Sequence, residues 1–415
     1  MSLEDPTAAS SQMSWEEAQG IARHAIDELP TATASVNDCV GSVLTQPLTA
    51  LADMPAYDTA LVDGWAVSGP GPWTIKPADR MDLFAGREFH EPGARVMLRD
   101  GQATQVHKGH PLGEGVTGVV AANRCLREGD LLKLSSTDRS AQGNRFRDEI
   151  APGTGMRPRG IDARANQVLL PAGHLINPAV AALAAAAGHD QLEVIPPPRV
   201  ALIRVGDAAL ASGIPRSGLA RDTVFPALPG WVQGLNAQTY PARWVNDGDL
   251  SLMDEIEDLL CDIVITSGPS TGAAIRRILY GLDAEVLVDG VAVNPGDTML
   301  LARLPDGRPL IHCGGSAQDA LATLLTLLAP MITTATGQAD HAIKMRLDDA
   351  TIGDRYRTTL VPVARSKTSG NGVGLITQGG PGGLLALSDA MGLAVIPPEG
   401  VRAFGTVTVL PLPVI

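Results

Sequence analysis

Over residues 177–336, short apolar runs alternate with segments of helical periodicity, and few folds accommodate this order. The apolar runs have strand character and lie at 200–205, 263–266, 298–304 and 310–313. The helical segments lie at 228–238, 249–260, 273–282 and 317–328. Strands that are buried on both faces and separated by helices predict a largely parallel, doubly wound α/β sheet with helices on each side.

The regions on either side have different patterns. Ser14 and Glu17 form a capping box before a helix expected over 14–29. Short β-like runs between Pro and Gly turns predict a β-rich region over 39–170, and Asn177 with Pro178 opens another helix that Gly188 ends. Strands are expected again at 342–347, 355–363, 372–377, 384–396 and 406–414. We therefore place domain boundaries near Asn177 and Gly337.

Charge and cysteine spacing exclude several classes of protein. The formal net charge of −13 argues against a nucleic-acid or anionic-membrane partner. The four cysteines are far apart and form no Cys-x-x-Cys pair, so neither a zinc site nor a disulfide framework is expected. No apolar run approaches the ~20 residues of a membrane span, and the start of the chain has no signal-peptide pattern. We therefore expect a cytoplasmic protein.

Three loops leave the carboxyl ends of the predicted central strands, where ligands of open α/β sheets bind. Their candidate ligand-binding residues are Gly206, Ser267, Gly268, Ser270, Thr271, Gly272, Gly314, Gly315 and Ser316. Small residues at a helix start expose backbone N–H groups to a phosphate or an oxyanion, although glycine also serves turn geometry alone. Since both Gly-x-Gly-x-x-Gly and the P-loop sequence are absent, a nucleotide-dependent dehydrogenase is disfavoured.

Several polar residues near these loops are candidate metal ligands. Asp207, Asp222, Asp247 and Asp249 offer the oxygen ligands that Mg²⁺ prefers, but each is also a common turn or N-cap residue. The His-x-x-His pair at 107–110 contains glycine, precedes proline and has no helical periodicity, so it indicates a loop rather than a metal site.

Residues 54–67, Met-Pro-Ala-Tyr-Asp-Thr-Ala-Leu-Val-Asp-Gly-Trp-Ala-Val, closely resemble the signature segment of the molybdopterin molybdotransferase family, which includes bacterial MoeA and the gephyrin E domain. Further segments resemble the family in the same order, namely 101–106 with 109–115, 156–162 with 170–173, 199–203 with 206–207, and 265–268. The resemblance therefore extends from about Ser14 to the C-terminus.

The resemblance implies a multidomain α/β and β protein with four domains. They are an extended domain from two segments (14–49 and 146–176), an inserted β-rich domain (50–145), a three-layer α/β molybdopterin-binding-type domain (177–336) and a C-terminal small β barrel (337–415). It also implies a homodimer whose α/β domain faces the partner's inserted domain, and other molybdenum cofactor assembly proteins as further partners. The family reaction hydrolyses adenylylated molybdopterin with Mg²⁺ and inserts molybdate.

By the same resemblance, Asp63, Asp207 and Asp247 are expected to be catalytic, with Asp207 and Asp247 as metal ligands. The chain departs from the family pattern elsewhere: Lys108 replaces a threonine, Ala208 a glutamate and Val224 an asparagine. The loops at 268–276, 294–298 and 314–317 also lack the family's acid, its lysines and its Pro-Gly-Asn-Pro sequence. If each lost charge-stabilising group contributes about 3 kcal/mol, turnover falls steeply. A non-catalytic paralogue that acts as a binding or scaffolding partner is therefore the alternative.

Overall fold

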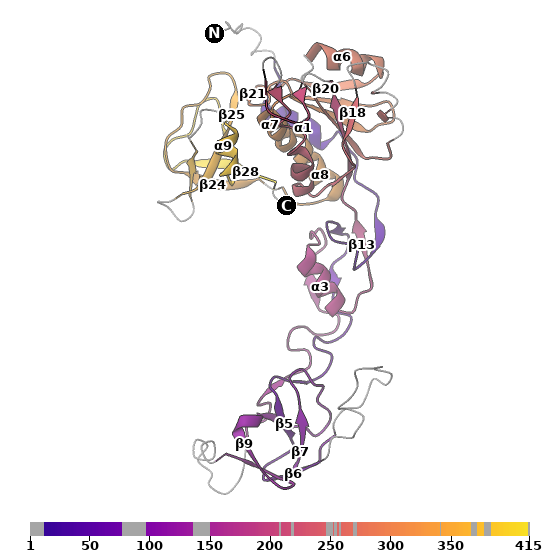
Figure 1. Ribbon diagram of the computed structural model, residues 1–415, viewed down its shortest axis with the longest axis vertical. Coiled ribbons are helices and arrows are strands. Elements are labelled where there is room, and N and C mark those ends of the chain that lie inside the picture. The colour runs from indigo at the N-terminus through magenta and orange to yellow at the C-terminus, as the bar shows by residue number, and fades with distance from the viewer. Residues whose placement is uncertain are drawn as a thin grey trace.

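The computed structural model describes residues 12–76, 97–135, 150–206, 209–216, 220–245, 252, 255–256, 259–268, 272–340, 342–366, 372–376 and 383–413. The molecule is elongated (Figure 1). The α/β domain and the C-terminal β domain lie side by side at one end, a narrow part with α3 and β13 follows, and a small β domain forms the far end. The domain bounds that the resemblance implies stay predictions.

The α/β domain contains one mixed sheet in the order β17-β14-β19-β23-β22-β20, with β18 also paired to β14. The strands are β14 (Arg199–Val205), β17 (Gln238–Thr239), β18 (Arg243–Val245), β19 (Ile263–Ser267), β20 (Glu285–Asp289), β22 (Leu300–Arg303) and β23 (Pro309–Cys313). Strands β14, β19 and β23 are neighbours and run parallel. The sheet is therefore parallel only in its centre.

Helices cover both faces of this sheet because alternate strand residues point to opposite sides. Val200 and Leu202 face a core shared with α1 (Trp15–Arg23), α4 (Leu228–Gly234), α7 (Ala317–Thr323), η3 (Leu324–Leu328) and α8 (Ala329–Thr336). Ala201 and Ile203 face a second core shared with α6 (Gly272–Gly281) and with Leu252 and Ile256. These two cores make the domain three-layered.

The strand expected at 298–304 corresponds to β22 and pairs antiparallel with β23, which corrects the expectation that it belongs to the parallel part, whereas β23 itself is parallel to β19. Only a short turn joins β22 to β23, closed by the hydrogen bond from Leu304 N–H to the Arg308 carbonyl (2.9 Å). A parallel connection requires a crossover of a dozen or more residues, which this turn cannot provide.

Three expected helices also have different ends. Helix α1 stops at Arg23 instead of Leu29, although its Ser14–Glu17 capping box is present as predicted. Helix α4 stops at Gly234, Asn236 follows in the left-handed conformation with a φ of 66°, and Gln238 and Thr239 then pair with β14. The helix expected at 317–328 continues to Thr336 through a π-helical turn, η3, and ends before Gly337 in the left-handed conformation. This segment is long and apolar enough to span a bilayer, but 78% of it is buried inside the protein, as in a core helix.

The narrow part is built from two chain segments. Its strands are β1 (Ala32–Ser35), β2 (Val43–Leu44), β3 (Leu48–Thr49), β12 (Val168–Leu170) and β13 (Gln191–Ile195), and its helix is α3 (Pro178–Ala186). Asn177 caps α3 and Gly188 has a positive φ of 98°, as the sequence predicts. Helix α3 packs into the core of this part, whereas α1 packs against the α/β sheet. We therefore propose a boundary near Pro197 in place of the one expected near Asn177.

The far domain has a six-stranded sheet in the order β8-β5-β7-β6-β10-β9. Its strands are β5 (Gly64–Val67), β6 (Trp73–Ile75), β7 (Gln102–Val106), β8 (Gly118–Ala121), β9 (Cys125–Glu128) and β10 (Leu131–Leu134), with η2 (Ala122–Arg124) between β8 and β9. A short pair, β4 (Thr59–Ala60) with β11 (Met156–Arg157), connects it to the narrow part. Trp73 is completely buried in this domain.

The C-terminal domain is a closed small barrel because β25 pairs with both β26 and β27. Its strands are β21 (Val293–Asn294), β24 (Ile343–Leu347), β25 (Thr358–Arg365), β26 (Gly372–Leu375), β27 (Gly392–Ile396) and β28 (Thr406–Pro411). The strand expected over 384–396 is instead a short helix, α9 (Leu384–Ser388), followed by β27. Ala386 of α9 is buried, so its apolar residues pack without joining the sheet.

Candidate functional site

The carboxyl ends of β14, β19 and β23 meet at one edge of the central sheet. Arg204 lies opposite Ser267, and Ser267 lies opposite Cys313, so the loops that begin at Gly206, Gly268 and Gly314 are neighbours. The sequence analysis places these three loops at the carboxyl ends of the central strands, which is where the structure has them. Asp207, Asp247, Asp249, Ser270 and Thr271 lie outside the described residues, and their predicted roles stay predictions.

The first loop is tied to β18. The Gly206 N–H donates to the Val245 carbonyl (2.9 Å), and the Trp244 indole N–H donates to the Gly206 carbonyl (3.0 Å). Both backbone polar groups of Gly206 are therefore used within the protein. Beyond the loop, β15 (Ala209–Leu210) and β16 (Ala220–Arg221) form a short parallel pair.

A buried ion pair lies beneath this loop. The Arg204 Nε is 3.3 Å from the Asp222 Oδ2, and the two side chains are only 8% and 10% exposed. The Arg204 guanidinium also donates to the Ala209 carbonyl. Asp222 Oδ1 accepts the N–H groups of Val224 (2.9 Å) and Phe225 (3.2 Å). Asp222, a candidate metal ligand in the sequence, therefore has both oxygens engaged, and its turn-forming role is the one observed.

The second loop is shaped by close backbone packing. A Cβ added to Gly268 would lie 2.1 Å from the Val205 carbonyl oxygen, so glycine is required here for geometry. The Ser267 hydroxyl donates to the Gly314 carbonyl (3.2 Å), which joins the second loop to the third. Gly272 is the first residue of α6.

The third loop already holds a carboxylate. The Ser316 hydroxyl caps α7 by accepting the Asp319 N–H (3.1 Å) and donates to Asp319 Oδ2 (2.6 Å). Asp319 Oδ1 accepts the Gly296 N–H (3.0 Å), and a Cβ added to Gly314 would lie 2.8 Å from the Asp319 Cβ. Because Asp319 brings negative charge to this helix start, a phosphate would be repelled there.

Two titratable side chains of β23 lie beneath the third loop. His312 is 4% exposed and its Nδ1 is 3.0 Å from the Thr266 hydroxyl. Burial lowers the pKa of His312 to about 4, so the ring is neutral near pH 7. Burial, with a smaller effect of Asp319, raises the pKa of Cys313 to about 12, so this thiol is not a nucleophile.

Asp63 lies in the far domain, directly before β5. Its Oδ1 accepts the Lys108 N–H (2.9 Å) and is 3.4 Å from the His107 Nδ1, while the side chain is 73% exposed. The hydrogen bond from the Lys108 amide is the main reason that the pKa of Asp63 is lowered. The carboxylate is therefore ionised and open to solvent, and it also fixes the turn at 107–110.

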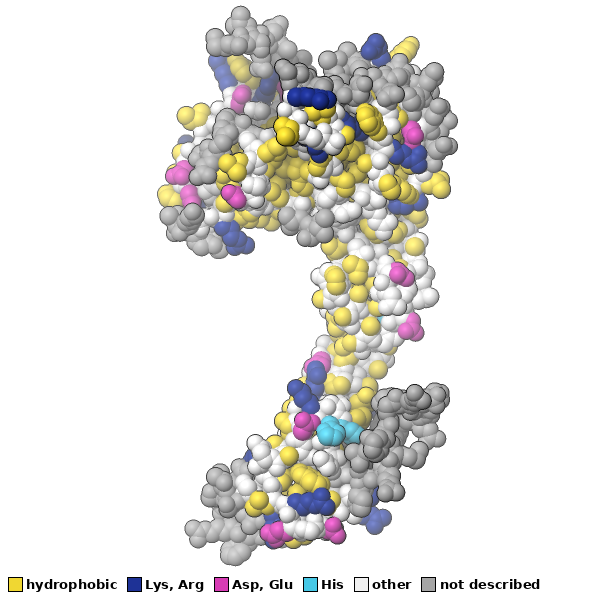
Figure 2. All heavy atoms as spheres, in the orientation of Figure 1, with side chains coloured by type: hydrophobic (Ala, Val, Ile, Leu, Met, Phe, Trp, Pro, Cys, Tyr) yellow, Lys and Arg dark blue, Asp and Glu magenta, His cyan; other side chains and the backbone are white. Residues whose placement is uncertain are grey.

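The His-x-x-His pair lies in this turn, as predicted. The His110 N–H donates to the His107 carbonyl (3.0 Å), and Gly109 has a positive φ of 83°. Figure 2 shows histidine side chains together with acidic and basic ones where the far domain joins the narrow part. Ion pairs there, such as Arg159 with Asp53 (2.7 Å), stabilise the chain segments that carry the family-like motifs.

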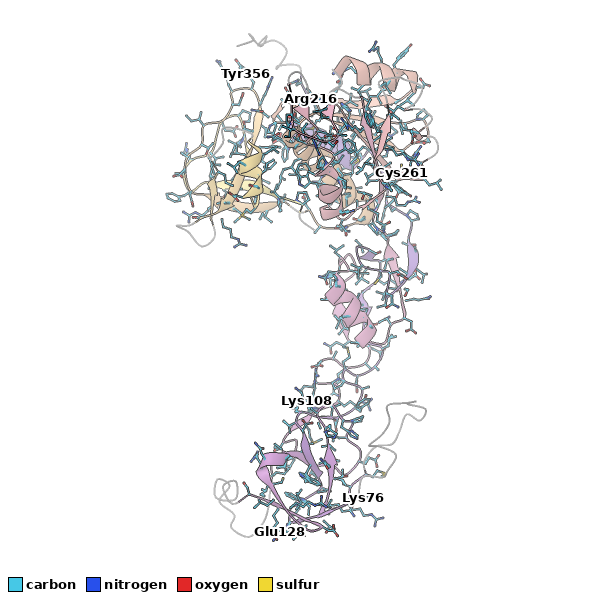
Figure 3. The ribbon with its side chains drawn as sticks, in the orientation of Figure 1. Lys76, Lys108, Glu128, Arg216, Cys261 and Tyr356 are labelled. Atoms are coloured by element: carbon cyan, nitrogen blue, oxygen red, sulfur yellow. The ribbon has the colours of Figure 1, made fainter. Side chains whose placement is uncertain are left out.

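Within one chain, the predicted site residues do not come together. Figure 3 places Lys108, whose amide contacts Asp63, in the lower part of the molecule, and Arg216, in the loop region after β14, in the upper part. The molecule's long axis is vertical in this view, so the two groups belong to different ends. A site that uses both requires a second chain.

Among the described residues, no group of three or more His, Cys, Asp or Glu side chains could hold a metal ion. At the sheet edge, Asp222 and Asp319 are occupied by hydrogen bonds, and Asp289 at the end of β20 is paired with Arg276. The described side chains therefore do not fit a Mg²⁺ site, and the prediction depends on Asp207 and Asp247.

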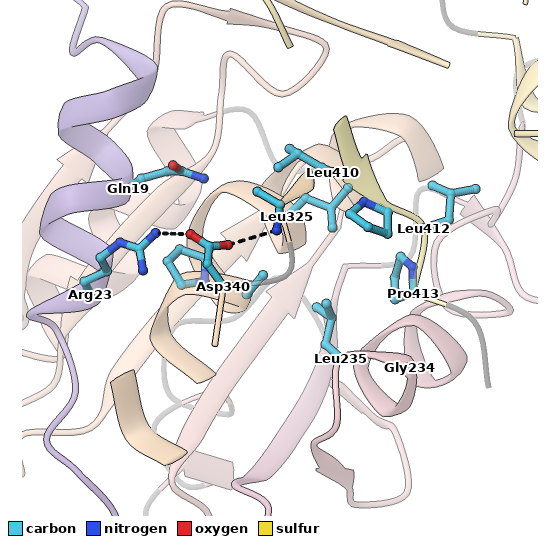
Figure 4. Close-up of a pocket in the computed structure, with 13 residues that line it drawn as sticks. Gln19, Arg23, Gly234, Leu235, Leu325, Asp340, Leu410, Leu412 and Pro413 are labelled. Carbon is cyan, nitrogen blue, oxygen red and sulfur yellow. Dashed lines mark hydrogen bonds and ion pairs between the residues drawn. The ribbon is translucent and has the colours of Figure 1, made fainter. Parts of the chain in front are cut away.

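A separate crevice lies between α1, η3, α8 and the C-terminal barrel (Figure 4). Its volume is about 240 Å³, and its lining is largely apolar, with residues such as Leu235, Leu325 and Leu410. The Arg23–Asp340 ion pair (2.8 Å) lies at its border. None of its lining residues belongs to the three loops, so it is a contact region between domains.

Residues 13–188 match the family model for the MoeA N-terminal region, domains I and II. Molybdopterin molybdenumtransferase 2 of Mycobacterium tuberculosis is 25% identical over 323 residues, which cover 74% of this chain and 76% of that protein. The molybdopterin molybdenumtransferase of a Nostoc species is 26% identical over 336 residues, covering 77% and 74%.

The fold is similar to that of a solved MoeA molybdopterin biosynthesis protein from Pyrococcus horikosii. The TM-score is 0.66 at 21% identity, and the match covers 97% of this chain and 99% of that one. A MoeA-like fold is thereby shown for nearly the whole chain, including the α/β domain and the barrel that lie beyond residue 188.

Proposed function

Since the chain belongs to the MoeA family, we propose that it acts in molybdenum cofactor biosynthesis as a molybdopterin molybdotransferase. Its substrates would be adenylylated molybdopterin and molybdate. The observation that carries this proposal is the meeting of three glycine-containing strand ends at one sheet edge, within a chain that matches transferases over most of its length. Because these relatives are named as transferases, a non-catalytic scaffold is not favoured.

We propose that the working unit is a two-fold symmetric homodimer. Asp63 and the three loops lie at opposite ends of one chain, whereas the far domain of a second chain could face the sheet edge of the first. Two-fold closure is the commonest symmetry of soluble oligomers. A particle of one chain's mass, 43.1 kDa, in light scattering would contradict this arrangement.

In the proposed reaction, the second loop, at the start of α6, would receive the substrate phosphates, and Asp63 would face them from the second chain. A carboxylate with a lowered pKa is a weak base, so Asp63 would act through its fixed negative charge and its hydrogen bonds. Mg²⁺ would neutralise phosphate charge where Asp207 and Asp247 lie. The described carboxylates at the sheet edge are already engaged by the protein and would not hold this ion.

Growth of a molybdotransferase-deficient bacterial host on nitrate tests the function directly. The wild-type chain should restore growth, and Asp63→Asn should abolish it with an unchanged melting temperature, because the amide keeps the acceptor for Lys108 N–H but loses the charge. Asp130→Asn is the matched control, since Asp130 is an exposed acid in the same domain, in the turn between β9 and β10.

Two outcomes would contradict the proposal. If the wild-type chain is expressed and folded but does not restore growth, the transferase activity is refuted. If Asp63→Asn lowers the melting temperature while activity per folded molecule is unchanged, Asp63 is a turn residue only.

A further inference from the structure

Trp244 is more exposed than any other tryptophan of the chain. The sequence contains five tryptophans, and Trp244 is 55% exposed, whereas Trp15 and Trp73 are 7% and 0% exposed. Trp65 and Trp231 are partly buried and pack against apolar cores. An exposed aromatic ring that is held in a fixed position offers a flat apolar face to a ligand.

The Trp244 ring is held in one orientation. Its indole N–H donates to the Gly206 carbonyl (3.0 Å), and the Arg204 guanidinium lies 5.0 Å from the ring centre. Arg204 is itself fixed by Asp222 and the Ala209 carbonyl, with its side chain 8% exposed. Because Arg204 covers one face of the indole, the exposed area belongs to the opposite face and the ring edge.

The position of the ring matches the ligand side of the sheet. Trp244 lies opposite Arg204 in the parallel pairing of β18 with β14, one residue before the end of β14. Ligands of open α/β sheets bind beyond the carboxyl ends of the strands, beside the loop that begins here at Gly206. The exposed indole face therefore borders the candidate site and is ordered before any ligand arrives.

We propose that Trp244 is a stacking platform for the planar heteroaromatic ring of the substrate, with Arg204 as the residue that positions the indole. The inference rests on the proposed function, whose adenylylated molybdopterin carries two such rings, a pterin and an adenine. Base–aromatic stacking contributes about 1–3 kcal/mol, so loss of the platform should weaken binding roughly 5- to 150-fold.

The test measures binding of adenosine monophosphate and of a simple pterin, 6-hydroxymethylpterin, to the full-length chain by ligand-observed NMR. Trp244→Phe keeps an aromatic face and should keep most of the affinity, although it loses the N–H to Gly206. Trp244→Leu keeps apolar bulk without an aromatic face and should lose affinity by the stated factor. The probe that loses affinity in Trp244→Leu identifies the ring that stacks.

Trp231→Phe is the matched control, because this partly buried tryptophan of α4 packs against the apolar core and is not in the three loops. Melting temperatures of all variants separate binding from folding. In Trp244→Leu, Arg204 also loses its aromatic neighbour, which could lower stability. If Trp244→Leu and Trp244→Phe have equal melting temperatures but different affinities, the difference in affinity is due to stacking.

Equal affinity of wild type and Trp244→Leu for both probes, or no binding of either probe to the wild type, would overturn the inference. Failure of the proposed function is recognised separately. Growth on nitrate without an effect of Trp244 refutes the platform alone, whereas a Trp244-dependent affinity without growth refutes the transferase function alone.

Discussion

The buried His312 should make the α/β domain sensitive to acid. His312 belongs to β23, and its buried ring is hydrogen bonded to the Thr266 hydroxyl. Burial lowers the pKa of His312 from 6.5 to about 4. Below pH 6.5 the unfolded chain takes up a proton at this position, whereas the folded chain stays neutral until about pH 4. The unfolded state thus binds more protons in this window, and stability falls as the pH falls.

The size of this effect follows from the difference between the two pKa values, about 2.5, at 1.36 kcal/mol for each pKa unit. The free energy of unfolding should therefore lose about 3 kcal/mol between pH 6.5 and pH 4 because of His312 alone. His312→Gln keeps a polar group near Thr266 but does not titrate, so this part of the loss should disappear.

Urea unfolding of wild type and His312→Gln at about pH 7 and about pH 4 measures the two losses, since the other acidic groups contribute equally to both proteins. Hydrogen exchange of peptides from β19 and β23 measures the stability of the α/β domain separately from that of the other domains. Equal pH dependence of the two proteins would refute the reasoning and would mean that His312 is protonated, or reaches water, in the folded state.

Two further substitutions test the packing that positions the sheet edge. Gly268→Ala should reduce stability by about 1–3 kcal/mol because its Cβ would lie 2.1 Å from the Val205 carbonyl oxygen, whereas Gly281→Ala, with nothing within 4 Å, should be neutral; equal melting temperatures of the two variants would contradict this. Trp15→Phe removes the buried hydrogen bond to the Thr326 hydroxyl (3.0 Å) and should cost about 1–3 kcal/mol in urea unfolding. Adding Thr326→Val should recover part of that loss, and a double variant less stable than Trp15→Phe would argue against the unpaired hydroxyl as the cause.

The sequence predicts many helix ends correctly because their signals are local. The Ser14–Glu17 capping box, the Asn177 cap and the left-handed Gly188 are each visible in a few neighbouring residues, and the structure contains all three. The apolar run of β14 has residues buried on both faces, which is why it reads as a central strand.

The differences arise where pairing outweighs local preference. The apolar runs of β22 and β23 look alike, and only the length of the connecting turn decides that they pair antiparallel. The helix expected over 228–238 ends at Gly234, where Asn236 adopts a left-handed conformation and Gln238 then pairs with β14. Residues 384–396 contain enough apolar residues for one strand, but the barrel uses only Gly392–Ile396.

The candidate site is less predictable, because it depends on residues that are distant in sequence. Arg204 stands out in the sequence only as a charge in the otherwise apolar run that follows Arg199 in β14, and nothing there reveals that Asp222 and Trp244 lie beside it. The three glycine loops could be placed at one edge from the strand pattern. The side chains that fill these loops could not be predicted, because the Asp319 carboxylate reaches the third loop through tertiary hydrogen bonds.

Because of these contacts, the charge differs between the two sides of the sheet edge. At the β23 side, Ser316 and Asp319 close the third loop around a negative charge, which opposes a phosphate there. At the β14 side, Arg204 lies under the exposed Trp244, and its charge is shared with Asp222. A ligand that carries both a phosphate and a planar ring is therefore favoured toward the β14 and β19 loops. The exposed indole lies on that same side of the edge, next to Gly206.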